Sequence, residues 1–342
     1  MKKIISKMLA LALVSAIGVS CDNEVPDGGN FEQGNEIRFS DLVTRAGDPE
    51  NEAEKLLNTI NDFGVYGQVS DQEDPNPETS SNIPYTQIFD KLNVYRGADS
   101  WEYDPAEVQY WLGNRAYHFF AFWPYNTATS LDNRGGYKVS YETPGTANGY
   151  LLGAHEIVDV DGVFPDVVKF KFSHLLSRVC LNISQDNIKN PYDDYMFRIK
   201  AVRLSNVKKN GTLSTSRTNQ AGTWTYDNAR LTFESVFDDE SGLLEGSKVI
   251  APWGANGQGY HFIPQSFEKG DISLIVEYAF KETTASEWES KTASTSLPAG
   301  AWSPGVTYTY QMKVYEDNFV TFSNISVEGW GSYLTGGAII IK

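Results

Sequence analysis

The sequence predicts an all-β protein built from β-sandwiches, and three observations favour this fold class. Trp, Tyr and Phe make up 45 of the 342 residues, and aromatic side chains favour strands. Short apolar runs recur every ten or so positions, separated by Gly, Asn, Asp and Pro. After residue 20, no stretch keeps the apolar period of a helix for more than about three turns. Many short strands with turn residues between them are typical of sandwiches rather than βαβ units.

The first expected strand covers residues 36–43, where apolar and polar residues alternate loosely. The Gly-Asp-Pro turn at 47–49 ends it, and an acidic helical turn is expected over 50–57. Apolar or aromatic runs then predict strands over 63–69, 91–95, 117–123, 167–172, 179–183, 197–204, 273–280, 307–315 and 338–341.

The first twenty residues predict a secretory signal peptide. Lys2, Lys3 and Lys7 precede an uncharged apolar run over 8–19, which is the pattern of an export signal. That run is too short to cross a membrane. Cys21 follows the small residue Ser20, which is where a bacterial lipoprotein is cut and acylated. The alternative is an ordinary signal peptide followed by an incidental cysteine.

The mature chain is long enough for two domains. We expect a signal peptide over 1–20, a polar Gly- and Pro-containing tether over 21–35, an N-terminal β-sandwich over 36–165 and a C-terminal β-sandwich over 166–342. The boundary is set by the turn-rich segment 159–166, which interrupts the strand pattern.

The net charge and the cysteine content argue against nucleic-acid binding and against a reactive or metal-binding thiol. The formal net charge of −16 disfavours nucleic acid, because binding phosphates needs clustered Lys and Arg. If Cys21 is acylated, the other cysteine, Cys180, cannot form an intramolecular disulfide. Cys180 lies in an apolar run, so we expect a buried thiol that is neither nucleophile nor metal ligand.

The sequence shows no catalytic motif. Its four histidines, His118, His155, His174 and His261, lack zinc-site spacing, and we expect His118 and His174 to be hydrogen-bonded core residues. Nucleophile elbows, dinucleotide fingerprints and phosphate loops are absent from the sequence. We therefore expect no enzyme activity, no cofactor and no metal site.

Several segments, taken in order, resemble the fimbrillin family (type V pilins), including its Mfa-like branch. They are 44–46 (TRA), 63–66 (FGVY), 117–125 (YHFFAFWPY), 168–179 (VKFKFSHLLSRV), 262–266 (FIPQS), 302–310 (WSPGVTYTY) and 327–330 (VEGW). The resemblance implies two transthyretin-like β-sandwich domains in tandem, export as an outer-membrane lipoprotein acylated on Cys21, and assembly into surface fimbriae that support adhesion.

The resemblance also implies how subunits join. An arginine-specific protease would cut between Arg45 and Ala46 and release the strand over 36–43. A C-terminal segment of another fimbrial subunit, roughly 319–342 and ending in Ala338, Ile339, Ile340 and Ile341, would then fill the vacated groove. The implied partners are other fimbrial subunits, membrane lipid at Cys21 and the maturation protease.

The residues themselves fit this scheme but leave alternatives open. Arg45 lies between a strand and a turn, where proteolysis concentrates, yet it also fits a solvated loop charge. The isoleucine run 339–341 can equally be the last strand of its own sheet, which would leave a monomer. A stalk, tip or anchor role is also left open.

The rival function is a monomeric glycan-binding surface lipoprotein. Trp101, Trp111, Trp253 and Trp288 lie near turns and are the candidates for sugar stacking, whereas Trp123, Trp302 and Trp330 fit core or strand-edge positions.

Overall fold

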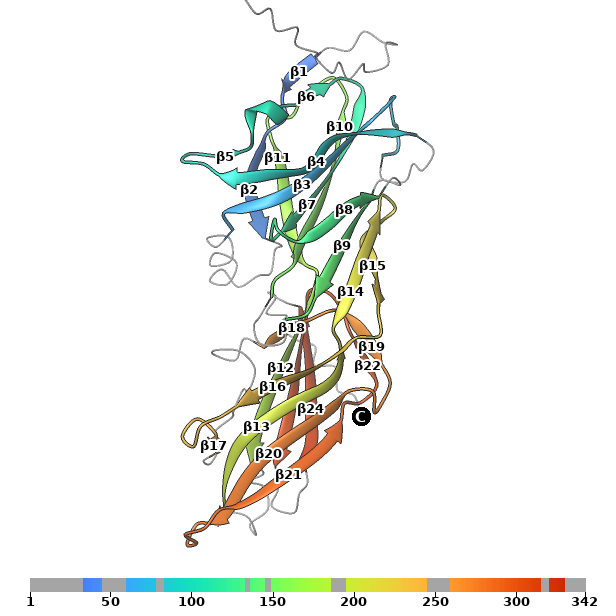
Figure 1. Cartoon of the computed structure of the whole chain (residues 1–342). Helices are drawn as coiled ribbons and strands as arrows, with labels where there is room; N and C mark the ends of the chain where they lie inside the picture. Colours follow the sequence, from blue (N-terminus) through green and yellow to red (C-terminus); the bar gives the residue numbers. More distant parts are fainter. Residues whose placement is uncertain are drawn as a thin grey trace, which may run out of the picture. The chain divides into compact units, whose positions relative to one another are not determined.

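The computed structural model describes residues 33–44, 60–77, 83–132, 136–144, 149–185, 195–244, 259–314 and 320–329 (Figure 1). Strands dominate these residues, and the single helical element among them is the short 3-10 helix η1 (Pro105–Glu107). Asp104 begins η1 by accepting a hydrogen bond from the backbone N–H of Ala106 at 2.9 Å. The expected all-β fold class is confirmed.

A seven-stranded sheet holds the first part of the chain, in the order β2-β11-β10-β7-β3-β4-β5. All neighbours in it are antiparallel except β2 and β11, which are parallel. Its strands are β2 (Phe39–Thr44), β3 (Asp62–Ser70), β4 (Tyr85–Arg96), β5 (Trp101–Glu102), β7 (Arg115–Trp123), β10 (Leu152–Val160) and β11 (Val168–His174).

The centre of this sheet is buried on both faces. In β7, Phe119 packs into the core that holds Phe39, while Phe120 and Phe122 point into a second core on the other face. Because successive side chains of a strand point to opposite faces, a strand covered on both sides needs an unbroken apolar run. This explains why residues 117–123 contain aromatic rings at successive positions.

A four-stranded sheet covers the second core, in the order β15-β14-β9-β8. Tyr137, Val139 and Leu213 of this sheet belong to the same apolar cluster as Phe120 and Phe122. Its strands are β8 (Ala128–Asp132), β9 (Gly136–Glu142), β14 (Asn210–Ser216) and β15 (Asn219–Tyr226). A further pair joins β1 (Gln33–Glu36) to β6 (Tyr110–Leu112).

The last part of the chain forms a sandwich of two further sheets. One has the order β18-β12-β23-β24 and the other β16-β13-β20-β21, with β17 paired to β13 and a separate pair β19-β22. Alternate residues of β12, β13, β20 and β23, such as Leu181, Ile199, Val276 and Tyr310, meet in one buried cluster. The strands are β12 (Ser177–Gln185), β13 (Tyr195–Lys208), β16 (Arg230–Val236), β17 (Leu243–Leu244), β18 (Tyr260–Phe262), β19 (Gln265–Phe267), β20 (Ser273–Glu282), β21 (Glu289–Ser296), β22 (Gly300–Trp302), β23 (Val306–Val314) and β24 (Val320–Gly329).

Most of the expected strands coincide with observed ones, with one division. The strand expected over 36–43 is split, because β1 ends at Glu36 and β2 begins at Phe39. The strand expected over 338–341 and the helical turn expected over 50–57 lie outside the described residues.

Hydrogen-bonded sheets cross the expected domain boundary at 165/166. β11 follows that boundary but pairs with β2 and β10, and β9 pairs with β14. The division into two transthyretin-like domains stays a prediction. Within the described part of the chain, no helix has the length and apolar character needed to cross a membrane.

Candidate functional site: the first strand and its groove

The residues expected to be modified, cut or donated lie outside the described residues. These are Cys21, Arg45, Ala46, Ala338, Ile339, Ile340 and Ile341. The structure does describe the segment that directly precedes Arg45, which is the strand expected to be released, and it describes the groove that holds this strand.

This strand, β2, lies at the edge of the seven-stranded sheet. Among the described strands it pairs along one side, with β11, in a parallel register that matches Phe39 with Val168 and Thr44 with Phe172. The register shifts between Lys169 and Lys171. An edge strand is joined to its sheet by one ladder rather than two, so β2 can leave without breaking any other strand pair in that sheet.

Two apolar side chains fix this segment in the core. Ile37 is fully buried, and Phe39 is 3% exposed. The ring of Phe39 lies 5.7–5.9 Å from four others, and these contacts are edge-to-face except for a stacked one with Phe170. The four partners are Phe89, Tyr103, Phe119 and Phe170. Burial of each such side chain is worth about 1.5–3 kcal/mol.

Backbone hydrogen bonds hold the same segment where β1 passes into β2. The N–H of Ile37 donates to the carbonyl of Gln109 at 2.8 Å, and the N–H of Val168 donates to the carbonyl of Arg38 at 2.7 Å. The hydroxyl of Tyr103 donates to the carbonyl of Ile37 at 2.6 Å. Burial, and next the Glu36 carboxylate, raise the pKa of Tyr103, so the phenol keeps its proton and remains a donor at neutral pH.

Arg38 contrasts with this buried pattern. Its side chain is 65% exposed and forms an ion pair with the carboxylate of Glu36 at 3.3 Å. The backbone of Arg38 is nevertheless held in the sheet by Val168. Arg45, in contrast, comes one residue after the end of β2 at Thr44.

At the other end of the described chain, β24 is also an edge strand. Of the strands that the structure describes, it pairs with β23, in an antiparallel ladder from Val306 and Gly329 to Val314 and Val320. The expected donor segment 319–342 therefore begins with a strand that is bonded to its own sheet along one side.

Two of the histidines, His118 and His155, belong to a partly buried chain of hydrogen bonds. Tyr85 donates to Asp74 at 2.8 Å, and Nε2 of His118 lies 3.1 Å from the Tyr85 oxygen. Nδ1 of His118 lies 3.3 Å from Nε2 of His155. Since the Tyr85 proton goes to Asp74, Nε2 of His118 donates and its Nδ1 accepts from His155.

Burial, then the neighbouring His155 and Arg217, lower the pKa of His118 to about 3. His118 is therefore neutral at physiological pH, in agreement with the expected core role. Across the described ranges, no three His, Cys, Asp or Glu side chains gather as a metal site would require. Cys180 is buried, as expected.

The described tryptophans fit core or strand-edge positions. Trp111, a candidate for sugar stacking for which a core role was preferred, is fully buried, and Trp302 is a core residue as expected. Trp101 packs on Phe63 at 5.1 Å, and Trp288 lies under the guanidinium of Arg198 at 4.2 Å. Trp123, expected in the core or at a strand edge, is half-buried and lines a surface hollow. Trp253 and Trp330 lie outside the described residues.

These features define an all-β protein whose first strand closes the edge of a sheet and is followed at once by the basic residue Arg45. Residues 44–330 match the family model described as fimbrillin-like. The chain therefore belongs to the fimbrillin-like family, and the resemblance deduced from its sequence segments is confirmed.

Solved structures share this fold at low sequence identity. A fimbrial protein from Bacteroides vulgatus ATCC 8482 superimposes with a TM-score of 0.65 at 16% identity, covering 86% of this chain and 100% of that one. A candidate cell adhesion protein from Bacteroides ovatus ATCC 8483 gives a TM-score of 0.50 at 15% identity, covering 88% and 98% of the two chains. No curated protein sequence matches this chain.

Proposed function

We propose that this protein is a structural subunit of surface fimbriae, assembled by strand exchange after proteolysis. In this proposal the chain is exported, is anchored in the outer membrane through acyl groups on Cys21, and is cut by an arginine-specific protease between Arg45 and Ala46. The cut releases the preceding strand together with the lipid anchor. The mature subunit then joins its neighbours at the cell surface and supports adhesion.

The observation that carries this proposal is the edge position of β2 over an aromatic groove. Removing β2 would expose the free backbone edge of β11 and the pocket that Phe39 fills. Phe170 and Phe172 of β11 belong to the same apolar cluster as Phe39 and would line that opening. An open strand edge beside an apolar groove is a template for another chain's strand.

The opposite end of the chain supplies a suitable donor. The proposed donor run is formed by the β-branched residues Ile339, Ile340 and Ile341, whose side chains favour an extended strand. Burial of three isoleucines is worth about 5–9 kcal/mol before the cost of ordering the strand. A neighbour's tail can therefore replace the stabilisation lost with Ile37 and Phe39.

Limited proteolysis with a purified arginine-specific protease tests the proposal. We expect one N-terminal cut, read by N-terminal sequencing as a new start at Ala46, and a ladder of oligomers on unheated denaturing gels. The variant Arg45→Ala should remain uncut and monomeric. The matched control Arg38→Ala should be cut and assemble like the parent, because the Arg38 backbone is held by Val168 inside the sheet.

Two outcomes would contradict the proposal. If the protease cut first at Arg38, the hydrogen bonds of the sheet would not protect residues 37–44 from proteolysis. Clean cutting at Ala46 without oligomers, at concentrations where the untreated protein is fully soluble, would show that the vacated edge recruits no second chain.

A further inference from the structure

Two adjoining hollows lie on the sheet formed by β8, β9, β14 and β15. Their volumes are about 330 Å³ and about 470 Å³, and both fall in the range of about 300–1,000 Å³ typical of small-ligand sites. Ser140, Tyr141 and Glu142 of β9 line both hollows. We call the two together the β9 groove.

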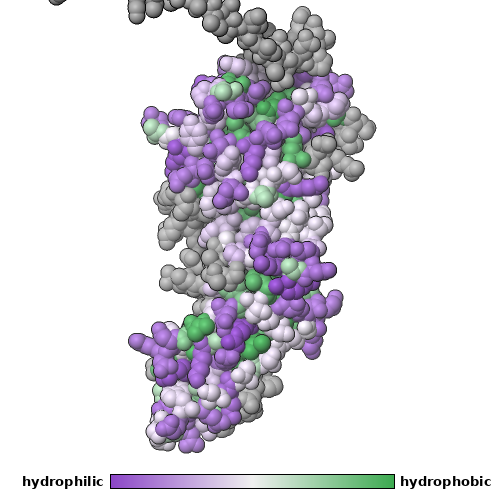
Figure 2. Space-filling view, in the orientation of Figure 1, coloured by the Kyte–Doolittle hydropathy of each residue, from purple (hydrophilic) through white to green (hydrophobic). Residues whose placement is uncertain are grey.

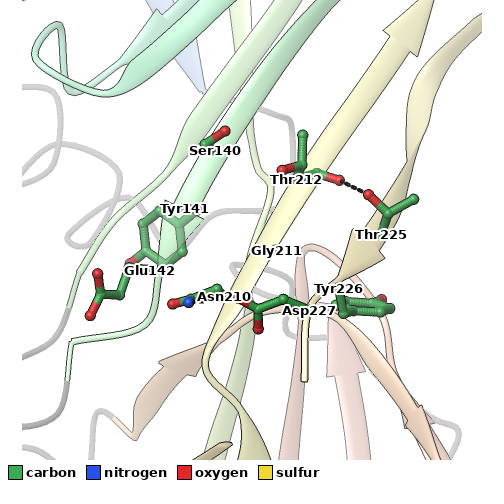
Figure 3. A pocket seen from close by; sticks show the side chains of 9 residues that line it. All are labelled: Ser140, Tyr141, Glu142, Asn210, Gly211, Thr212, Thr225, Tyr226 and Asp227. Carbon is green, nitrogen blue, oxygen red and sulfur yellow. Dashed lines mark hydrogen bonds between the residues drawn. The ribbon is translucent and has the colours of Figure 1, made fainter. Parts of the chain in front are cut away.

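The first hollow offers a row of hydrogen-bonding groups (Figure 3). Thr212 lies opposite Ser140 on one side and Thr225 on the other, so three hydroxyls cross three neighbouring strands. Two residues further along β9, and on the same face of the strand, Glu142 lies opposite Asn210. The Asn210 amide donates to Asp227 at 2.8 Å, which places an amide and two carboxylates beside the hydroxyl row.

The second hollow adds aromatic faces. Trp123, Tyr141 and Tyr150 line it. The Trp123 and Tyr150 rings are 6.1 Å apart and tilted by 47°, and Tyr150 meets the His261 ring edge-to-face at 4.7 Å. Tyr150 is thereby held in place while remaining only partly buried.

Two residues that line the hollows each carry a buried polar atom without a hydrogen-bond partner among the described residues. They are the hydroxyl oxygen of Tyr141 and Oδ1 of Asn210. A buried polar group without a partner costs about 1–3 kcal/mol, so a side-chain rotation that turns either atom towards a ligand hydroxyl would gain that interaction. Burial raises the pKa of Tyr141, so its phenol stays protonated and can donate.

We propose that the β9 groove binds a short neutral oligosaccharide. A sugar ring presents an apolar C–H face and a rim of hydroxyls, which matches an aromatic wall beside carboxylates, amide and hydroxyls. Figure 2 includes pale surface in the middle of the molecule, which is the colour of side chains of intermediate hydropathy such as the Ser, Thr and Tyr that line the groove.

Charge selects neutral rather than anionic glycans. The groove is lined by the carboxylates of Glu142 and Asp227 and by no basic side chain. The cations beside it are already engaged, because Lys209 pairs with Glu142 at 2.7 Å, Arg230 donates to the Asp227 carbonyl at 3.3 Å, and Lys208 lies 3.8 Å over the Tyr226 ring. The net charge of the chain is −16. Sialic acid, sulfate and uronic acid groups would therefore meet like charge.

Glycan-array screening and titration calorimetry on the purified mature protein test this assignment. The neutral probes are mannan, xyloglucan and N-acetyllactosamine oligomers, and the anionic probes are heparin and sialyllactose. Ser140→Arg places a long side chain in both hollows, and Tyr150→Ala removes an aromatic wall. We expect each to weaken binding of the neutral probe by about tenfold or more.

Matched controls separate loss of binding from loss of folding. Ser294→Arg changes an equally exposed serine on β21, and Tyr195→Ala removes a partly buried tyrosine that packs on Phe280 at 5.8 Å, both away from the groove. These two variants should bind like the parent. Absence of binding to every neutral probe, binding of anionic probes alone, or full binding by Ser140→Arg would each overturn the assignment. None of these results depends on whether the protein polymerises.

Discussion

Replacing Phe39 with alanine measures how firmly the first strand is held. The side chain is 3% exposed and contacts four aromatic rings within 5.9 Å. Truncation of a buried phenylalanine to alanine costs about 3–5 kcal/mol of unfolding free energy. In the uncut protein we expect the midpoint of urea unfolding of the N-terminal sheet, followed by tryptophan fluorescence, to fall by about 1–2 M.

The control on the same segment is Arg38→Ala. Because the Arg38 side chain is 65% exposed, this change should alter the free energy of unfolding by no more than about 0.5 kcal/mol. After the strand has been removed by cleavage, the Phe39→Ala and parent proteins should unfold alike, since neither retains residue 39. A loss below about 1 kcal/mol in the uncut protein would refute the idea that Phe39 anchors β2.

Two further predictions concern the opposite face of the seven-stranded sheet from Phe39. Burial lowers the pKa of His118 to about 3, whereas an unfolded histidine titrates near 6.5. The unfolded chain therefore binds more protons between these values, and stability should fall as pH drops from about 6.5 towards 3; thermal unfolding from pH 7 to 4 should show a smaller decline in His118→Asn than in the parent. Gly64→Ala should lower the free energy of unfolding by at least about 1–3 kcal/mol in chemical denaturation, because the added methyl group would overlap the Phe122 ring. Gly162→Ala, with φ of +75° but open space around it, adds backbone strain without a steric overlap and should cost less than Gly64→Ala. A loss at Gly162 as large as that at Gly64 would contradict the packing argument.

Strands buried on both faces were the easiest to predict from the sequence. Residues 117–123 are almost continuously apolar or aromatic, and they form most of β7, which has a core on each side. In β7 the local sequence pattern and the burial of both faces require the same thing, which is apolar side chains at successive positions. The alternation in 36–43 likewise predicted a strand, although not the break between β1 and β2.

The sheet that carries the β9 groove was not predicted. β14 has the sequence Asn-Gly-Thr-Leu-Ser-Thr-Ser, with one large apolar residue, Leu213. Its strand character comes from pairing with β9 and β15 rather than from its own side chains. Polar strands of this kind give no local apolar signal, because one face is open to solvent.

The contacts that make up the candidate site could not be predicted from the sequence either. The rings around Phe39 come from residues 89, 103, 119 and 170, and no local spacing relates these positions. Trp123 was expected in the core or at a strand edge, and it does end β7 and pack against a core, but its position beside Tyr150 could not be predicted. Sequence patterns report the face of a strand, whereas a site depends on which strands become neighbours.

The two proposed sites can be gained or lost separately, because they use different edges of the fold. Within the described sheets β2 pairs with β11, so its release breaks no strand pairing to β9, β14 or β15. The groove residues Ser140, Thr212 and Thr225 belong to a sheet that contributes no strand to the ladder at β2. A subunit that has exchanged its first strand should therefore still bind the neutral oligosaccharide with the affinity of the uncut protein. If cleavage at Arg45 abolished sugar binding, the two sites would have to be coupled through β10 and β7, which link β11 to Trp123.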